Sequence, residues 1–246
     1  MRALGERGLP PTVELRGKAY HLVQDVKHDF FAATGFYESD DGQRIVLKAG
    51  RNHDFLGIPL TWLGRWLRDR EMRFYNRLRD LPNIPNIVGT FGETGFLLEF
   101  VRGTPLRKDT AVPDRFFFEV RKLIEQIHAR DIAYVDMNKK ANLIIGEDRR
   151  PHLVDFQISW DLCELGDNFI TRRILRWLQR EDLYHIAKHH GRFRPDELSP
   201  EQIEAGRRRS ILIRLHRFIF KPWFGIRRRT WKRLRETGRL LPEGSE

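Results

Sequence analysis

Cysteine is almost absent from the sequence, and long apolar runs are absent altogether. The one cysteine among the 246 residues, Cys163, can form neither an intrachain disulfide nor a zinc site made of several cysteines. The N-terminal stretch lacks the apolar core of a secretory signal, and no segment approaches the roughly 18 apolar residues of a membrane span. We therefore expect a folded protein of the reducing cytoplasm.

Acidic residues are scarce in the C-terminal segment. Residues 207–239 contain 13 Lys or Arg and a single acid, Glu236, whereas the formal net charge of the whole chain is +11. The remainder is close to neutral, which differs from the pattern of a uniformly basic nucleic-acid binder. With 40% apolar and 32% charged residues, the chain has a globular composition and is long enough for one two-lobed domain or two small ones.

Apolar periodicity predicts a strand-rich first half. An Asp-Gly turn at residues 40–43 between two alternating runs is typical of a hairpin, and residues 60–81 have apolar side chains at helical spacing. The predicted strands are 20–26, the two arms of that hairpin, 87–91 and 95–101. In the second half, the sequence predicts a helix from Pro113 and Asp114 to Asp131, short strands in NLIIG and HLVDF, and helical structure from Asn168 with a break at RFRPDELSP.

Five polar residues follow these elements in an order that suits phosphoryl transfer. Lys48 ends the strand RIVLK and Glu71 lies on the next helix, while Asp136 and Asn142 lie in YVDMNKKANLII and Asp155 begins DFQIS. Transfer from ATP needs a cation on the phosphates, oxygen ligands for magnesium and a carboxylate that orients the acceptor. Each residue alone would be an ordinary surface or turn residue, so the prediction depends on the ordered set.

The sequence from about Tyr20 to Ser159 resembles the protein-kinase-like superfamily. The run IHARDIAYVDMNKKANLII resembles its catalytic loop, and HLVDFQIS resembles its metal-binding segment. The resemblance implies that Asp136 is the catalytic aspartate, that Asn142 and Asp155 bind magnesium, and that Glu71 holds Lys48 toward the phosphates of ATP.

The resemblance extends to the adenine site and the terminal phosphate. FLLEFVRGTPL resembles the hinge between the lobes, so the Glu99 carbonyl and the Val101 N–H are expected to bind adenine. Lys139 or Lys140 would reach the terminal phosphate, and Lys139 is favoured. The compact second lobe and the altered metal segment are similar to atypical small bacterial kinases, including lipopolysaccharide-core and RIO-like kinases.

Several departures from the family pattern set this chain apart. No GxGxxG is present, and residues 27–35 have one glycine where the phosphate-covering loop is expected. Tyr134 and Val135 precede Asp136, the interval from Asp136 to Asn142 is one residue longer than usual, and Gln157 replaces a glycine. No APE motif follows, which argues against regulation by phosphorylation of an activation loop.

We predict an α+β fold with two lobes, an antiparallel-sheet lobe at 1–101 and a compact helical catalytic lobe at 102–206, followed by a basic amphipathic segment at 207–246. The predicted function is ATP- and Mg²⁺-dependent transfer of phosphate to a hydroxyl of a protein Ser/Thr or of a lipopolysaccharide-type sugar. The alternative is a catalytically weak pseudokinase that serves as a membrane- or protein-binding scaffold.

The basic segment has its own alternatives. Trp223, Phe224 and Trp231 among the arginines would suit the inner face of an anionic membrane, and a terminal helix packed on the second lobe is an equal alternative. RNA is the weaker candidate partner.

Other aromatic and histidine residues are given structural interpretations. His128 is expected to be packed or capping, and His185, His189 and His190 lack a matching carboxylate set for a metal. Trp62, Trp66 and Trp177 are expected in the core.

Overall fold

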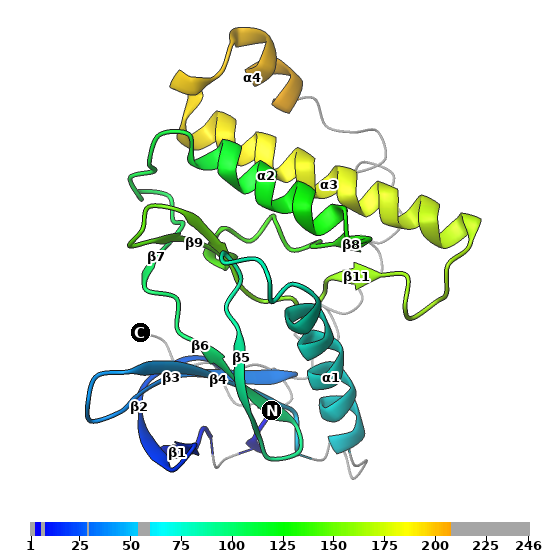
Figure 1. The fold of residues 1–246 in the computed structure, drawn as a ribbon. Helices are drawn as coiled ribbons and strands as arrows, with labels where there is room; N and C mark the ends of the chain where they lie inside the picture. The colour runs from blue at the N-terminus through cyan, green and yellow to red at the C-terminus, as the bar shows by residue number, and fades with distance from the viewer. Residues whose placement is uncertain (1–2, 6–7, 29, 54–59, 208–246) are drawn as a thin grey trace, which may run out of the picture.

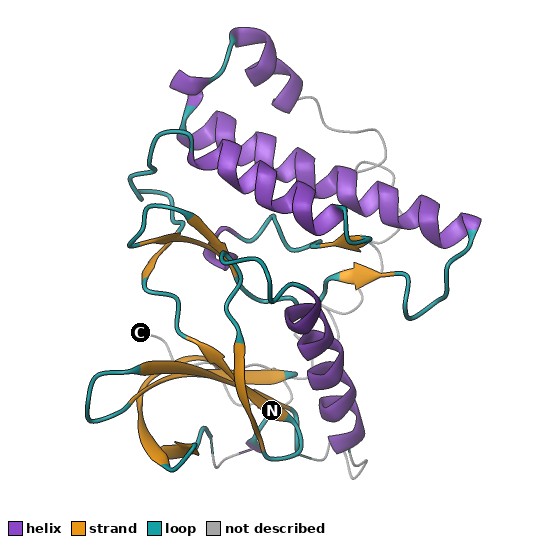
Figure 2. Cartoon of the chain, viewed as in Figure 1, coloured by secondary structure: helices purple, strands orange, loops and turns teal. Residues whose placement is uncertain are grey.

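The computed structural model describes residues 3–5, 8–28, 30–53 and 60–207, and these form two lobes (Figure 1). The first lobe is an antiparallel six-stranded sheet in the order β1-β2-β3-β4-β6-β5, with helix α1 beside it (Figure 2). Its elements are β1 (Thr12–Leu15), β2 (Lys18–His28), β3 (Ala32–Glu38), β4 (Arg44–Gly50), α1 (Thr61–Arg77), β5 (Ile87–Phe91) and β6 (Gly95–Glu99).

Helices form most of the second lobe, where α2 and α3 lie side by side. The helices are α2 (Phe116–His128), α3 (Phe169–Phe193) and α4 (Pro200–Arg207), with short 3₁₀ turns at Lys140–Asn142 and Pro195–Glu197. This lobe also contains two small antiparallel sheets. One consists of β10 (Pro151–Leu153), β9 (Leu143–Gly146) and β7 (Gly103–Pro105), and the other consists of β11 (Trp160–Asp161) and β8 (Ile132–Ala133). The predicted two-lobed α+β fold is confirmed.

Side-chain alternation in β4 determines which residues face the space between the lobes. Ile45, Leu47 and Ala49 are buried in a cluster on the outer side of the sheet. Val46 and Lys48 therefore point to the other side, because successive strand residues face opposite ways. The predicted hairpin is confirmed, and its turn uses Gly42 in a left-handed conformation with φ 81°.

One apolar core connects the two lobes. Phe74 and Tyr75 of α1 belong to the same buried cluster as Phe116 of α2, Tyr134 and Phe156. Because α1 packs into the core of the second lobe, its position is coupled to that lobe as well as to the sheet.

Three expectations at this level are wrong. Trp62 is 62% exposed and Trp66 is 50% exposed, since α1 turns Gly64 and Arg70 inward instead; helical spacing does not say which face is buried. The helix expected from Pro113 begins at Phe116, after Arg115 in a left-handed conformation.

Four short strands had no clear sequence signal: β1, β7, β8 and β11. The last three also depend on partners far along the chain, because β7 pairs with β9 and β8 pairs with β11. The boundaries at 101 and 206 stay predictions. The predicted basic segment lies, apart from Arg207, outside the described residues.

Candidate active site

Lys48 connects the two lobes through two carboxylates. Its Nζ donates to Glu71 Oε1 of α1 and lies 2.9 Å from Asp155 Oδ1, which follows β10. The side chains of Lys48 and Glu71 are almost completely buried. The predicted convergence of the strand lysine, the helix glutamate and the metal-segment aspartate is therefore present in the structure.

The backbone around Asp155 is held in an uncommon conformation. Asp155 has φ 67°, a value few residues other than glycine adopt, and its N–H donates to the Tyr75 hydroxyl at 3.1 Å. The N–H of Phe156 donates to Glu71 Oε1 at 3.2 Å. Strained backbone of this kind persists where the surroundings over-determine it, as at many functional sites.

Asp136 lies at the centre of the catalytic-loop candidate. Its Oδ2 accepts hydrogen bonds from Asn142 Nδ2 at 2.9 Å and from Lys139 Nζ at 2.5 Å. Lys140 turns away, with its Nζ 5.6 Å from the ring centroid of Phe193. The structure therefore places Lys139, and not Lys140, against Asp136, although the interval from Asp136 to Asn142 is one residue longer than usual.

Asp182 is a buried carboxylate that sequence reasoning missed. It lies on α3, and its two oxygens accept from the N–H groups of Tyr134 and Val135, each at 2.8 Å. His128 Nε2 hydrogen-bonds the same carboxylate at 3.0 Å, which gives that histidine a packed structural place. Val135 has φ 68°, so Asp182 holds the strained turn just before Asp136. A lone aspartate in a basic helix gives no sequence signal of this contact.

The electrostatics differ between the two site aspartates. Burial raises the pKa of Asp155, but the nearby lysines, Lys48 foremost, outweigh this effect and lower that pKa to about 2. Burial raises the pKa of Asp136 above its ordinary value, and Lys139 offsets only part of that rise. Burial alone would lower the pKa of Lys48, yet Glu71 and Asp155 hold it above its ordinary value. Lys48 and Asp155 are thus charged at neutral pH.

Apolar side chains share the face of the sheet that bears Lys48. Phe36 of β3 pairs directly with Val46 of β4, two residues before Lys48. Side chains of directly paired residues lie on the same face. The predicted hinge follows β6, where the Glu99 carboxylate accepts hydrogen bonds from the backbone N–H and the side-chain N–H₂ of Asn86, both at 3.0 Å. The adenine-binding roles of the Glu99 carbonyl and the Val101 N–H stay predictions.

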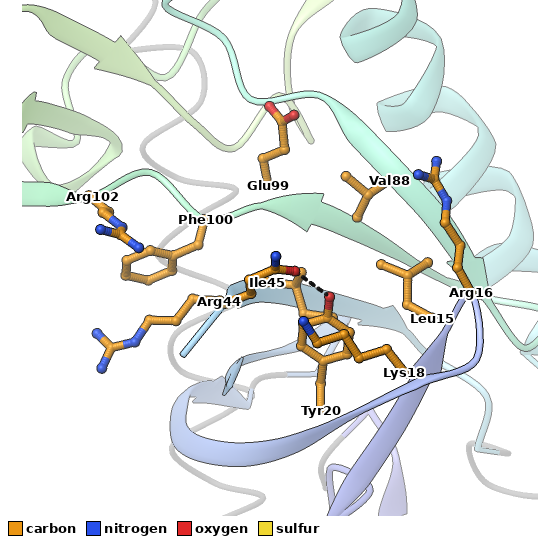
Figure 3. Close-up of a pocket in the computed structure, with 11 residues that line it drawn as sticks. Leu15, Arg16, Lys18, Tyr20, Arg44, Ile45, Val88, Glu99, Phe100 and Arg102 are labelled. Carbon is orange, nitrogen blue, oxygen red and sulfur yellow. Dashed lines mark hydrogen bonds between the residues drawn. The ribbon is translucent and has the colours of Figure 1, made fainter. Parts of the chain in front are cut away.

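A cavity of about 590 Å³ lies at the hinge but outside this site (Figure 3). It lies between the β1–β2 turn and the start of β4, and Ile45 on the outer face of β4 contributes to its lining. Lys48 points to the other face of that strand, so this cavity is not where the five polar residues meet.

Among the described residues, no group of three or more His, Cys, Asp or Glu side chains is arranged as a metal site. His189 instead donates to the Met137 carbonyl at 3.0 Å, and His190 pairs with Glu197. A magnesium ion at Asp155 and Asn142 would thus need further oxygen ligands, which nucleotide phosphates supply.

No protein-family model matches the sequence, and no curated protein matches it. Solved structures match the fold. A complex of Rio2 kinase from Chaetomium thermophilum with ADP, Mg²⁺ and phosphoaspartate has a TM-score of 0.53, with 16% identity over 72% of this chain and 59% of that chain. A second structure of that Rio2 kinase has a TM-score of 0.50, with 16% identity over 66% of this chain and 54% of that chain.

The BubR1 kinase domain has a TM-score of 0.54, with 15% identity over 75% of this chain and 65% of that chain. This chain matches less than two thirds of the length of each of these three structures. The fold is therefore protein-kinase-like, as the sequence resemblance predicted. Within the described residues, no helix is long and apolar enough to cross a membrane.

Proposed function

We propose that this protein is an ATP- and Mg²⁺-dependent phosphotransferase that phosphorylates a hydroxyl. The main support is the contact of Lys48 with both Glu71 and Asp155, because it places a cation from one lobe on a carboxylate from the other. Asp136 and Asn142 hydrogen-bond each other beside that pair. A cation, oxygen ligands and a separate carboxylate base are the groups that phosphoryl transfer requires.

Lys48 would bind the phosphates of ATP. Its charge persists because Glu71 and Asp155 hold its pKa high, and Glu71 fixes its direction through a hydrogen bond. When nucleotide binds, the Lys48 ammonium would exchange its contact with Asp155 for phosphate oxygens and keep Glu71. Phe36 and Val46 would pack against the adenine, whose edge the hinge backbone at Glu99 and Val101 would read.

Asp155 and Asn142 fit a magnesium ion by the chemistry of their donors. The Asp155 carboxylate is ionised at neutral pH, and Asn142 donates its amide N–H₂ to Asp136, so its amide oxygen would be the atom that coordinates the ion. Mg²⁺ binds oxygen ligands, commonly one or two protein groups together with phosphates. When bound, it would neutralise charge on the transferring phosphate.

Asp136 would orient the acceptor hydroxyl and take its proton. Its raised pKa makes it a better base than an ordinary aspartate, and the hydrogen bond from Lys139 favours the ionised carboxylate. Lys139 is half exposed and would place its charge near the terminal phosphate. The acceptor class, a protein Ser/Thr or a lipopolysaccharide-type sugar, follows from the resemblance alone.

The first experiment replaces Asp155 with alanine in the full chain. We expect loss of phosphate transfer by at least about 10³-fold, because the main magnesium ligand is removed, with the fold retained since Asp155 is partly exposed. Radiolabelled ATP incubated with whole-cell protein, lipid and RNA fractions measures the transfer and identifies the acceptor. Asp148→Ala removes an exposed turn aspartate and serves as the control.

Unchanged transfer by folded Asp155→Ala protein would contradict these roles. Binding of Mg·ATP by the unsubstituted chain without transfer to any fraction would favour the pseudokinase alternative.

A further inference from the structure

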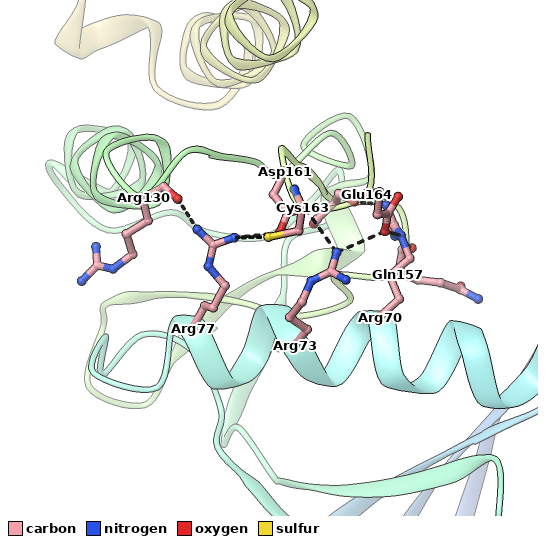
Figure 4. Close-up of polar contacts among 9 residues, drawn as sticks. Arg70, Arg73, Arg77, Arg130, Gln157, Asp161, Cys163 and Glu164 are labelled. Carbon is pink, nitrogen blue, oxygen red and sulfur yellow. Dashed lines mark hydrogen bonds and ion pairs between the residues drawn. The ribbon is translucent and has the colours of Figure 1, made fainter. Parts of the chain in front are cut away.

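Three arginines on α1 hold the segment that follows the metal-binding aspartate (Figure 4). Arg70, Arg73 and Arg77 are spaced i, i+3, i+7, so they lie along one face of the helix. Their partners in this segment are the carboxylates of Asp161 and Glu164 and the backbone carbonyls of Gln157 and Ser159. We call these five side chains the arginine clamp.

Arg70 uses its whole guanidinium in the clamp. It is 9% exposed and donates to the Gln157 carbonyl at 2.6 Å, to the Ser159 carbonyl and to Glu164. The next residue on α1 is Glu71, the partner of Lys48. Any shift of α1 that moved Glu71 away from Lys48 would therefore break several charge-assisted hydrogen bonds of Arg70.

Arg73 and Arg77 join α1 to the strand pair that leads into the catalytic loop. Both bind Asp161, which is completely buried, at 3.2 and 2.7 Å. Asp161 lies on β11 and pairs with Ile132 of β8, two residues before Tyr134. Arg77 also donates to the Arg130 carbonyl, just before β8. The clamp thus connects the position of Glu71 to that of Asp136.

The clamped segment offers little for phosphorylation. Between Asp155 and Asn168, Ser159 is the only residue with a hydroxyl. Ser159 is fully buried, and its Oγ donates to the Tyr134 carbonyl at 3.0 Å. Carboxylates bind arginine with the same bidentate chemistry as phosphate. Asp161 and Glu164 carry their charge without modification, whereas a phosphate would have to be added.

We propose that the arginine clamp holds Glu71 on Lys48 permanently, so that the site is assembled without phosphorylation of this segment. The clamp residues act as positioning residues for the phosphotransferase function proposed above, on which this inference rests. Arginine remains charged at any physiological pH, so the clamp does not open by titration of its cations.

The test compares Glu164→Gln and Arg73→Gln with Arg65→Gln in the full chain. Glu164→Gln removes a charge and preserves shape. Arg65 lies on the same helix as the clamp arginines, but it pairs with exposed Glu93 of the β5–β6 turn and not with a clamp residue. We expect turnover to fall about tenfold in both clamp variants and to be unchanged in Arg65→Gln. In a Glu71→Gln background, Glu164→Gln should have no further effect, because both changes act through one contact.

A purely structural role would give a different pattern. Equal losses from Glu164→Gln with and without Glu71, or no loss at all, would overturn the proposal. Phosphatase treatment of the unsubstituted protein should leave turnover unchanged, and loss of turnover would likewise overturn it.

Hydrogen exchange separates a failure of the clamp from a failure of the proposed function. The Phe156 N–H, which is bonded to Glu71, should exchange about tenfold faster in Glu164→Gln and at the original rate in Arg65→Gln, whether or not ATP is turned over. If the unsubstituted chain has no turnover but the exchange result holds, the proposed function is wrong and the clamp stands. Unchanged exchange in Glu164→Gln refutes the clamp.

Discussion

At the scale of single residues, Asp136 shows how burial and a neighbouring cation compete. Burial raises its pKa, and Lys139, which donates to the same carboxylate, lowers it by a smaller amount. A base must be ionised to accept a proton, so transfer is lost as the pH falls through the Asp136 pKa. Because the Asp136 pKa is raised, the acid limb of the pH profile of turnover should lie above the pH at which an ordinary aspartate titrates.

Replacing Lys139 with methionine should move the acid limb of turnover to higher pH, because burial then acts on Asp136 without the offsetting cation. A pH profile of turnover measures the shift. Lys140→Met is the matched control, since Lys140 lies against Phe193, and its limb should not move. A limb that stays in place in Lys139→Met, or moves to lower pH, would contradict the contact.

At the scale of elements, the start of α1 depends on a close backbone approach. A Cβ added at Gly64 would lie 2.0 Å from the Arg51 carbonyl oxygen, a distance that real Cβ atoms do not have. Near the end of α3, a Cβ at Gly191 would make only ordinary contact, 4.0 Å from Leu198. Helix propensity favours alanine over glycine at both sites by about 1 kcal/mol, so the packing at each site decides whether the substitution raises or lowers the free energy of unfolding.

Gly64→Ala should lower the free energy of unfolding by about 2–4 kcal/mol, because α1 must move away from the sheet. Gly191→Ala should raise it by about 0.5–1 kcal/mol. Urea unfolding of both variants measures the two effects. A stabilised Gly64→Ala variant would show that α1 is not held as closely to Arg51 as the structure indicates.

The contact between α3 and the turn just before Asp136 gives a second prediction at this scale. Asp182→Ala would leave the N–H groups of Tyr134 and Val135 without their acceptor in a buried site. We expect a loss of about 3–5 kcal/mol in the free energy of unfolding. Glu181→Gln, at the neighbouring position, should change it by less than about 0.5 kcal/mol. Similar urea midpoints for the two variants would disagree with this account.

At the scale of the whole molecule, the positive charge is concentrated at one end of the chain. Residues 207–239 contain 13 Lys or Arg, while the rest of the chain is close to neutral. Each basic residue near an anionic bilayer contributes about 1 kcal/mol at low salt, and this charge is the basis of the prediction that the segment binds a membrane surface. Its other candidate partner, RNA, would be attracted by the same charges.

Replacing Arg227, Arg228 and Arg229 together with glutamine should reduce co-sedimentation with phosphatidylserine vesicles by at least about tenfold at 0.1 M salt. The full chain should not sediment with neutral phosphatidylcholine vesicles, which is the control. Retention on RNA but not on anionic vesicles would contradict the membrane proposal and favour the RNA alternative.

Sequence patterns anticipated the elements whose signal is local. The hairpin at residues 40–43 and the long helices follow from turn chemistry and apolar spacing. The residues that the family resemblance singled out, Lys48, Glu71 and Asp155, lie in contact in the structure. The two tryptophans of α1 were misplaced, because periodicity identifies a helix without identifying its buried face.

By itself, the sequence determined the order of the longer strands and helices, the motif residues of the site and the uneven charge, because these depend on neighbours along the chain. Only the tertiary structure decided that Asp182 holds the turn before Asp136 and that Arg70, Arg73 and Arg77 bind the segment beyond Asp155. These contacts join residues 47 to 94 positions apart, and the burial that makes them strong exists only once the distant segments have packed together.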